Sequence, residues 1–130
     1  MEHPVAPDTD TPFARLGGRD GVRAVVDELY RRAADDPDLA PYFHTTDLAT
    51  QRSRLTDMIA QAMGGPEAPW LKGLEEAHQG RGITHRHFSL MAAHLIDALE
   101  HHGVDPEEAD LLTSWFALGR DAVVDRNSPL

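Results

Sequence analysis

The sequence predicts an all-α protein. Apolar residues recur every three or four positions in several long segments, which is the spacing of one helix face. No segment shows the sustained alternation of apolar and polar residues that is typical of a strand. Glycine, proline and capping residues separate the segments at helix-like lengths. A chain of 130 residues is expected to form one domain.

The first long helix is expected between Asp20, which can cap its start, and Pro37, which cannot continue it. Tyr30 lies at the edge of its apolar stripe. The inward residues of this helix are expected to be Val22, Val25, Val26, Leu29 and Ala33. The following stretch, DLAPYF, is too short for a full helix and suits a single tight turn.

The second helix, LATQRSRLTDMIAQAM, is expected to start after a cap at Thr46 or Asp47 and to stop at the segment Gly64-Gly65-Pro66. Its apolar stripe comprises Leu48, Leu55, Ile59 and Ala62, with Met58 beside it. A loop then leads to a short helix, LKGLEEAHQG, which Gly80 ends.

Thr84 is the expected cap of a long helix that ends at Gly103, with Phe88, Met91, Ala92, Leu95 and Leu99 facing inward. The last helix is expected to open at Asp105, because Asp-Pro-Glu-Glu combines a cap with a first-turn proline and acidic residues. Leu112, Trp115, Phe116, Gly119 and Val123 follow on one side of it.

Composition narrows the range of functions. The formal net charge of −10 and the pI of about 5.1 argue against nucleic acids and anionic membranes as partners. The absence of cysteine excludes disulfides and thiolate sites. No apolar run approaches the roughly 20 residues of a membrane span. Residues 1–12 are rich in proline and aspartate and are expected to be a disordered tail, and a cytoplasmic location is expected.

Three polar residues fall on inward helix faces, where burial is costly unless their groups are satisfied. His78 shares a face with Leu71 and Leu74 in the short helix. Gln51 interrupts the stripe of the second helix, and Tyr30 borders that of the first. Each alone is more typical of an ordinary core residue. Together they suit a metal-bound ligand, with His78 on one side and hydrogen-bond donors on the other.

The remaining histidines give weaker metal sites. His87, His94 and His101 are seven residues apart, so adjacent members lie about 10 Å apart along a helix, too far to share one ion. We interpret them as solvated or capping residues, as we do His85. A di-iron carboxylate site needs two Glu-x-x-His motifs, and only the segment Glu75–His78 provides one.

The segments LGG, VVDELY, DPDLAPYF, MGGPE and AHQGRGIT, followed by HF, resemble those of the truncated haemoglobins, in particular the group I type. The resemblance covers about residues 13 to 125 and implies a two-over-two helical sandwich around haem b. On this reading residues 13–130 form the truncated globin domain, and residues 1–12 are its tail.

The resemblance also implies roles for particular residues. His78 matches the proximal iron ligand, whose second ring nitrogen should donate to a backbone carbonyl. Phe43 matches the aromatic residue that packs on the haem face. Tyr30 matches the distal tyrosine that hydrogen-bonds bound dioxygen, and Gln51 matches a second distal position. Further residues expected around the haem are Leu55, Met58, Ile83, Phe88 and Trp115.

Haem propionates need cations or hydroxyl groups at the pocket rim. Lys72 and Arg54 are the expected cations, and Thr46 is the expected hydroxyl donor. Leu55 departs from the family pattern, because group I members frequently carry a second polar distal residue there. The usual distal pair is therefore expected to be replaced by Tyr30 and Gln51.

The expected ligands are dioxygen, nitric oxide and carbon monoxide. The family resemblance also implies oxidation of nitric oxide to nitrate, for which a separate reductase would supply electrons. The alternatives are a peroxidase-like or other redox haem enzyme, and a module for storage, delivery or sensing of the gas. A haem-free helical protein, with His78 as a core residue, is the remaining alternative.

Overall fold

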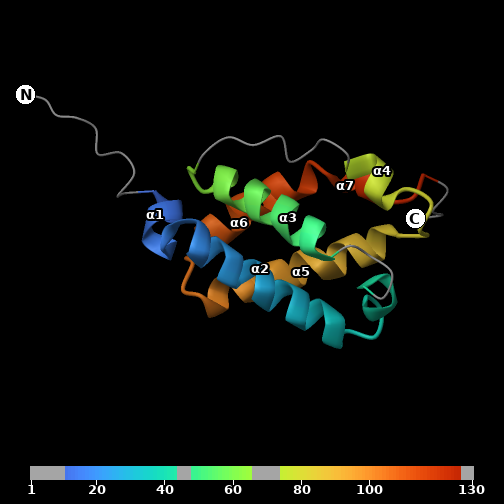
Figure 1. Cartoon of the computed structure of the whole chain (residues 1–130), viewed down its shortest axis with the longest axis horizontal. Coiled ribbons are helices and arrows are strands. Elements are labelled where there is room, and N and C mark those ends of the chain that lie inside the picture. The colour runs from blue at the N-terminus through green and yellow to red at the C-terminus, as the bar shows by residue number, and fades with distance from the viewer. Residues whose placement is uncertain (1–10, 44–47, 66–73, 127–130) are drawn as a thin grey trace, which may run out of the picture.

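The computed structural model describes residues 11–43, 48–65 and 74–126. All the regular elements in these ranges are helices, as predicted (Figure 1). They are α1 (Pro12–Leu16), α2 (Gly18–Asp35), the 3-10 helix η2 (Ala40–Phe43), α3 (Leu48–Ala62), α4 (Leu74–His78), α5 (His85–His101), α6 (Pro106–Ala117) and α7 (Arg120–Val123). No helix in the described part of the chain is both long and apolar enough to cross a membrane.

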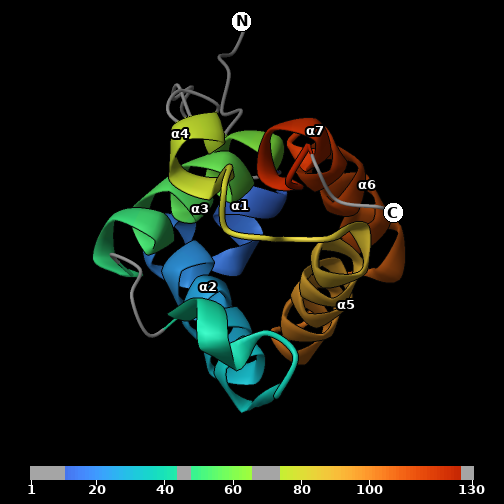
Figure 2. The ribbon, with the colours of Figure 1, turned by 90° about the vertical axis from the view of Figure 1, so that its right-hand side faces the viewer.

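The four long helices form two pairs. α2 packs on α3, and α5 packs on α6, while contacts of α2 with α5 and of α3 with α6 join the pairs. The end-on view shows α4, α7 and the segment between α4 and α5 at one end of these helices (Figure 2). The expected two-over-two arrangement is confirmed.

The apolar core fills the end of the bundle near α1. The side chains of Val25, Leu29, Ile59, Leu95 and Leu99 have no exposed surface. They come from α2, α3 and α5, and Leu112 of α6 closes the cluster. Burying each such side chain contributes roughly 1.5–3 kcal/mol, so this end of the bundle stabilises the fold and the other end is left for a pocket.

Local signals explain several helix ends. The Thr84 hydroxyl accepts the N–H of His87, and the Thr84 N–H donates to Nδ1 of His87 at 3.0 Å. This is a capping box in which histidine replaces the usual Glu or Gln. α2 ends at Asp35, because the residue before Pro37 disfavours helix. The predicted cap and the predicted stop are both confirmed.

The structure differs from the prediction in two details and adds a helix that was not predicted. Asp20 does not cap α2, which begins two residues earlier, at Gly18, so Asp20 lies in its first turn. A further helix, α1, precedes it and is capped by Thr11. The last helix is not continuous, because tight bonds from Leu118 N to Trp115 O and from Gly119 N to Phe116 O end α6 before α7 begins.

The glycines of the LGG segment allow α1 and α2 to meet. Gly17 has φ +106°, which ends α1 and turns the chain directly into α2. A Cβ on Gly21 would lie 1.9 Å from the carbonyl oxygen of Leu16, so the two helices approach at that point to a distance that only glycine permits.

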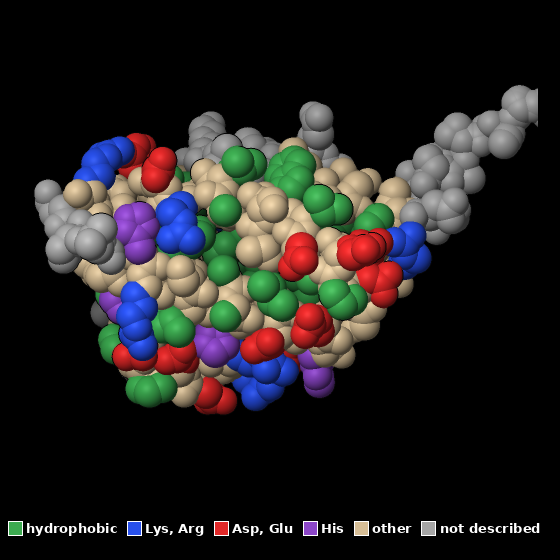
Figure 3. Space-filling view, turned by 180° about the vertical axis from the view of Figure 1, so that it is seen from behind, with side chains coloured by type: hydrophobic (Ala, Val, Ile, Leu, Met, Phe, Trp, Pro, Cys, Tyr) green, Lys and Arg blue, Asp and Glu red, His purple; other side chains and the backbone are tan. Residues whose placement is uncertain are grey.

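Acidic, basic and histidine side chains are interspersed on the face seen from behind, with hydrophobic side chains between them (Figure 3). Some charged side chains of the protein are paired between elements. Arg19 donates to Asp57 at 2.8 Å and joins α2 to α3, while Arg86 donates to Asp38 at 3.1 Å. Exposed pairs of this kind stabilise a fold only modestly.

Candidate functional site

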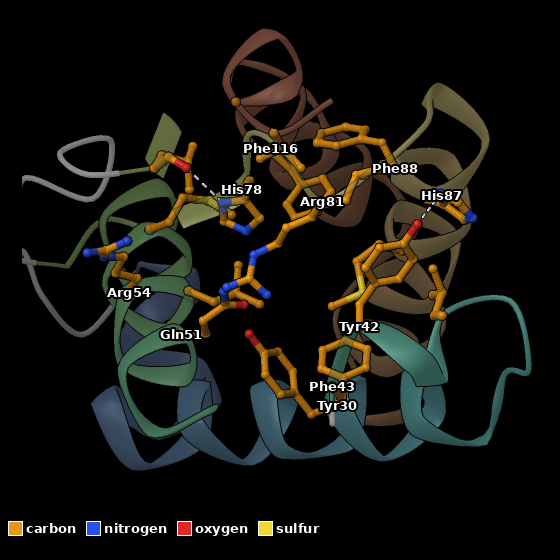
Figure 4. A pocket seen from close by; sticks show the side chains of 18 residues that line it. Tyr30, Tyr42, Phe43, Gln51, Arg54, His78, Arg81, His87, Phe88 and Phe116 are labelled. Carbon is orange, nitrogen blue, oxygen red and sulfur yellow. Dashed lines mark hydrogen bonds between the residues drawn. The ribbon is translucent and has the colours of Figure 1, made fainter. Parts of the chain in front are cut away.

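A pocket occupies the end of the bundle opposite the core (Figure 4). The space between its lining side chains, counted out to open solvent, is about 1030 Å³. Most of its wall is apolar. The lining residues are Tyr30, Leu39, Tyr42, Phe43, Gln51, Arg54, Leu55, Met58, Leu74, His78, Arg81, Ile83, His87, Phe88, Met91, Phe116, Gly119 and Val123.

His78 is the last residue of α4, and its ring points into the pocket (Figure 4). Its Nδ1 lies 2.8 Å from the carbonyl oxygen of Leu74, one helical turn earlier. Because a carbonyl oxygen only accepts, Nδ1 carries the proton and donates it. The predicted bond from a ring nitrogen to a backbone carbonyl is confirmed. Nε2 is therefore left with its lone pair available to bind a metal.

The surroundings of His78 favour its neutral form. Burial lowers the pKa of the imidazole below its ordinary value, and the nearby Arg81 and Arg54 guanidinium groups lower it further. The hydrogen bond to Leu74 raises the pKa but does not reverse the shift. Since coordination to a metal needs the unprotonated nitrogen, the site keeps His78 ready to act as a ligand near neutral pH.

Tyr30 lies across the pocket from His78 (Figure 4). It comes from α2, its side chain is buried, and its hydroxyl points into the pocket. Its ring packs against Phe43, with the ring centroids 5.4 Å apart. Burial raises the pKa of the phenol well above its ordinary value, so the hydroxyl keeps its proton and can donate a hydrogen bond.

α3 forms the wall between Tyr30 and His78. Gln51 and Leu55 lie one helical turn apart on its inner face, and Arg54 and Met58 also line the pocket. The Gln51 amide points toward the same space as the Tyr30 hydroxyl (Figure 4). Leu55 is itself apolar, so the uncharged polar groups on this side of the pocket are those of Gln51 and Tyr30.

The remaining predicted residues divide into three groups. Ile83 and Phe88 line the pocket, as does Phe43. Trp115 packs against the core instead, while its neighbour Phe116 lines the pocket and stacks on Phe88, with ring centroids 4.8 Å apart. Thr46 and Lys72 lie outside the described residues. The cofactor contacts of all these side chains stay predictions.

Sequence reasoning missed three polar residues of the pocket: Tyr42, Arg81 and His87. Tyr42 donates to the carbonyl oxygen of Gly82 at 3.1 Å and lies 3.3 Å from Nδ1 of His87. Both Tyr42 and His87 line the pocket, although His87 was interpreted as a bystander. The guanidinium of Arg81 reaches into the pocket (Figure 4). The capping role expected for His87 is present as well.

Among the described residues, the other histidines do not line this pocket. His94 Nε2 is 2.8 Å from Asp36 Oδ2, a contact that joins α5 to the end of α2. His101 is exposed, and its ring contacts that of His102. Within residues 11–43, 48–65 and 74–126, no group of three or more histidine and carboxylate side chains is arranged to hold a metal ion.

Comparison with known proteins places most of the chain in one family. The family model of the bacterial-like globins matches residues 11–124. The chain is 37% identical over 95 residues to a group 1 truncated haemoglobin from Mycolicibacterium paratuberculosis, covering 73% of this chain and 70% of that protein. It is 36% identical over 98 residues to the group 1 truncated haemoglobin of a Nostoc species, covering 75% and 83%.

Solved structures are similar in fold. The crystal structure of a truncated haemoglobin from Tetrahymena pyriformis, in its Fe(III) form, matches with a TM-score of 0.76 and 25% identity, covering 88% of this chain and 98% of that one. The structure of Chlamydomonas reinhardtii THB4 matches with a TM-score of 0.69 and 30% identity, covering 85% and 92%.

Proposed function

Because the chain belongs to the bacterial-like globin family, as a truncated haemoglobin of group 1, we propose that it holds one haem b with His78 as the protein ligand of the iron. Membership of the globin family implies haem binding. The observation that supports His78 as the ligand is its bond to Leu74, which leaves Nε2 unprotonated at the pocket surface.

The lining of the pocket suits haem in its chemistry. The apolar walls match a porphyrin ring. The Arg54 and Arg81 guanidinium groups are cations that can pair with carboxylates such as the two propionates. The neutral imidazole of His78 is a common protein ligand of haem iron.

We propose that the ligands are dioxygen, nitric oxide and carbon monoxide. Haem iron held by His78 would supply the coordination position for such a gas. Tyr30 supplies a hydroxyl donor across the pocket from His78, and Gln51 supplies an amide. In a pocket that excludes water, a hydrogen bond from either group is stronger than in bulk solvent. These two donors would therefore favour dioxygen, whose outer oxygen is partly negative when it is bound, over carbon monoxide.

Conversion of nitric oxide to nitrate is a second candidate function. It is favoured by the placement of both distal donors around one space, which would retain dioxygen while nitric oxide enters. The reaction consumes electrons, and a separate reductase would supply them. Storage, delivery or sensing needs only the binding step, so sustained turnover of nitric oxide with a reductant distinguishes these functions.

The proposal is tested by adding haemin to the purified protein and recording the absorption spectrum of the ferric, ferrous and carbon monoxide forms. We expect a Soret band that saturates at one haem per chain and shifts when carbon monoxide is added. A protein that gains no Soret band would overturn the proposal. Nitric oxide consumption in the presence of dioxygen and an electron donor then separates the functions, because a dioxygenase converts many molecules of nitric oxide per haem.

A further inference from the structure

The helix that carries His78 depends on its neighbours for its orientation. In the described residues α4 covers Leu74–His78, and none of these residues is fully buried. Most of the stability of a helix in a protein comes from its packing on neighbouring elements. α4 packs on α7, and the two helices are neighbours in both ribbon views (Figures 1 and 2). The direction of the His78 ring therefore depends on how α4 is attached to α7.

Gln79, the residue after His78, makes that attachment. Its Nε2 donates to the carbonyl oxygens of Ala122 at 3.0 Å and Val124 at 2.7 Å. Its Oε1 accepts the backbone N–H of Arg126 at 3.2 Å. Both amide hydrogens and the amide oxygen are thus used by one short segment of chain. The amide cannot be reversed, because its oxygen would then face two carbonyl oxygens.

The Gln79 side chain is joined rigidly to the histidine. The backbone N–H of Gln79 donates to the carbonyl oxygen of Glu75 at 2.9 Å, which continues the hydrogen-bond ladder of α4. Neighbouring residues on a helix point in different directions, since there are 3.6 residues per turn. His78 can therefore face the pocket while Gln79 faces α7. Any rotation of α4 about its axis would move both side chains together.

Two sets of hydrogen bonds together fix the orientation of the imidazole. The bond from His78 to Leu74 fixes the ring relative to α4, and the Gln79 bonds fix α4 relative to the end of α7. Val123, at the end of α7, lines the pocket. The iron ligand is thereby fixed relative to the pocket wall by Gln79 and not by packing of α4 alone.

We propose that Gln79 is a positioning residue for His78, setting the tilt and rotation of the imidazole that binds the haem iron. The inference rests on the proposed haem function. Neighbouring contacts extend the same attachment. Gly82 N donates to Asp125 Oδ2 at 3.1 Å, and Asp125 N donates to the Ile83 carbonyl at 2.8 Å. Loss of the Gln79 side chain should thus loosen α4, while the bonds of Asp125 keep the following segment attached.

The test compares Gln79→Met with wild type. Methionine keeps the length and the helix propensity of glutamine but cannot bond the two carbonyls or the amide. The matched control is Asp36→Asn, which alters side-chain bonds to His94 and to Asp38 N at a place remote from α4. The measurement is the iron–histidine stretching band in the resonance Raman spectrum of the ferrous, gas-free protein.

We expect the band to shift and broaden in Gln79→Met and to stay at the wild-type frequency in Asp36→Asn. Haem transfer to an acceptor apoprotein should be about tenfold faster in Gln79→Met, the effect of losing roughly one net hydrogen bond or more. An unchanged band in Gln79→Met would overturn the inference, even if the variant were less stable, because a merely structural role would leave the band unmoved.

Gln79→Asn is the second variant, and it is used if Gln79→Met does not fold. It keeps the amide but shortens the side chain by one methylene, so it cannot span the same gap, and it should also shift the band. An unshifted band there overturns the inference equally. Failure of the proposed function looks different, because wild-type protein would then bind no haem and show no Soret band.

Discussion

The rings of Tyr30 and Phe43 lie 5.4 Å apart, centroid to centroid, and are inclined by 54°. The contact joins α2 to η2 across one side of the pocket. It holds the phenol ring in place, so the hydroxyl has a defined position on the side of the pocket that faces His78. The hydroxyl can therefore be removed without removing the packing that holds the ring.

Tyr30→Phe should speed the release of dioxygen from the haem-loaded protein. The ring contact with Phe43 is kept, and only the donor is lost. A net hydrogen bond of about 1 kcal/mol corresponds to a change of roughly fivefold in rate, so release should be several-fold faster. The measurement is the dioxygen dissociation rate by stopped flow. Tyr42→Phe is the control, and an equal increase in both variants would contradict the role of Tyr30.

Gly21→Ala should destabilise the protein strongly. The added Cβ would lie 1.9 Å from the carbonyl oxygen of Leu16, so α1 and α2 must separate. Overpacking of this kind costs about 1–3 kcal/mol or more, as measured by urea unfolding. Gly18→Ala is the control: its Cβ meets nothing within 4 Å, and only the positive φ of +71° is strained. A smaller loss in Gly21→Ala than in the control would contradict the close approach.

Asp36→Asn should lower stability in a pH-dependent way. The hydrogen bond from His94 holds the pKa of the Asp36 carboxyl below its ordinary value of 3.8, with help from the Asp38 N–H. Because the folded pKa is the lower one, the folded state favours the carboxylate. Its stabilisation is present above about pH 3.8 and is lost as pH falls through the folded pKa.

The measurement is the difference in thermal midpoint between wild type and Asp36→Asn from pH 7 to pH 2.5. The difference should shrink as the pH falls below about 3.8. A difference that stayed the same across the whole range would show that the Asp36 carboxylate is not stabilised in the folded state.

Helical register was enough to predict that His78 faces inward. His78 shares a face with leucines, and its ring lines the pocket. Its bond to a backbone carbonyl was expected from the family resemblance. The Thr84 cap could be predicted in the same way, because its partner, His87, lies three residues away. Such features depend on neighbours within one helical turn, which a sequence shows directly.

The features that were missed depend on distant parts of the chain. The contact of Tyr42 with His87 joins residues 45 positions apart, and the bonds of Gln79 to Val124 do the same. Arg81 lies in a connecting loop, where sequence gives no helical face from which to infer its direction. The break before α7 comes from the tight turn at Gly119, which a sequence pattern of inward residues does not reveal.

The most direct test of the central claim is the spectrum of His78→Gly with and without added imidazole. The glycine variant should lose the normal iron ligation of the wild type, and free imidazole that enters the space left by the side chain should restore it. His87→Gly, changed at the other pocket histidine, should keep the wild-type spectrum. Normal ligation in His78→Gly without imidazole, together with its loss in His87→Gly, would show that His78 is not the ligand.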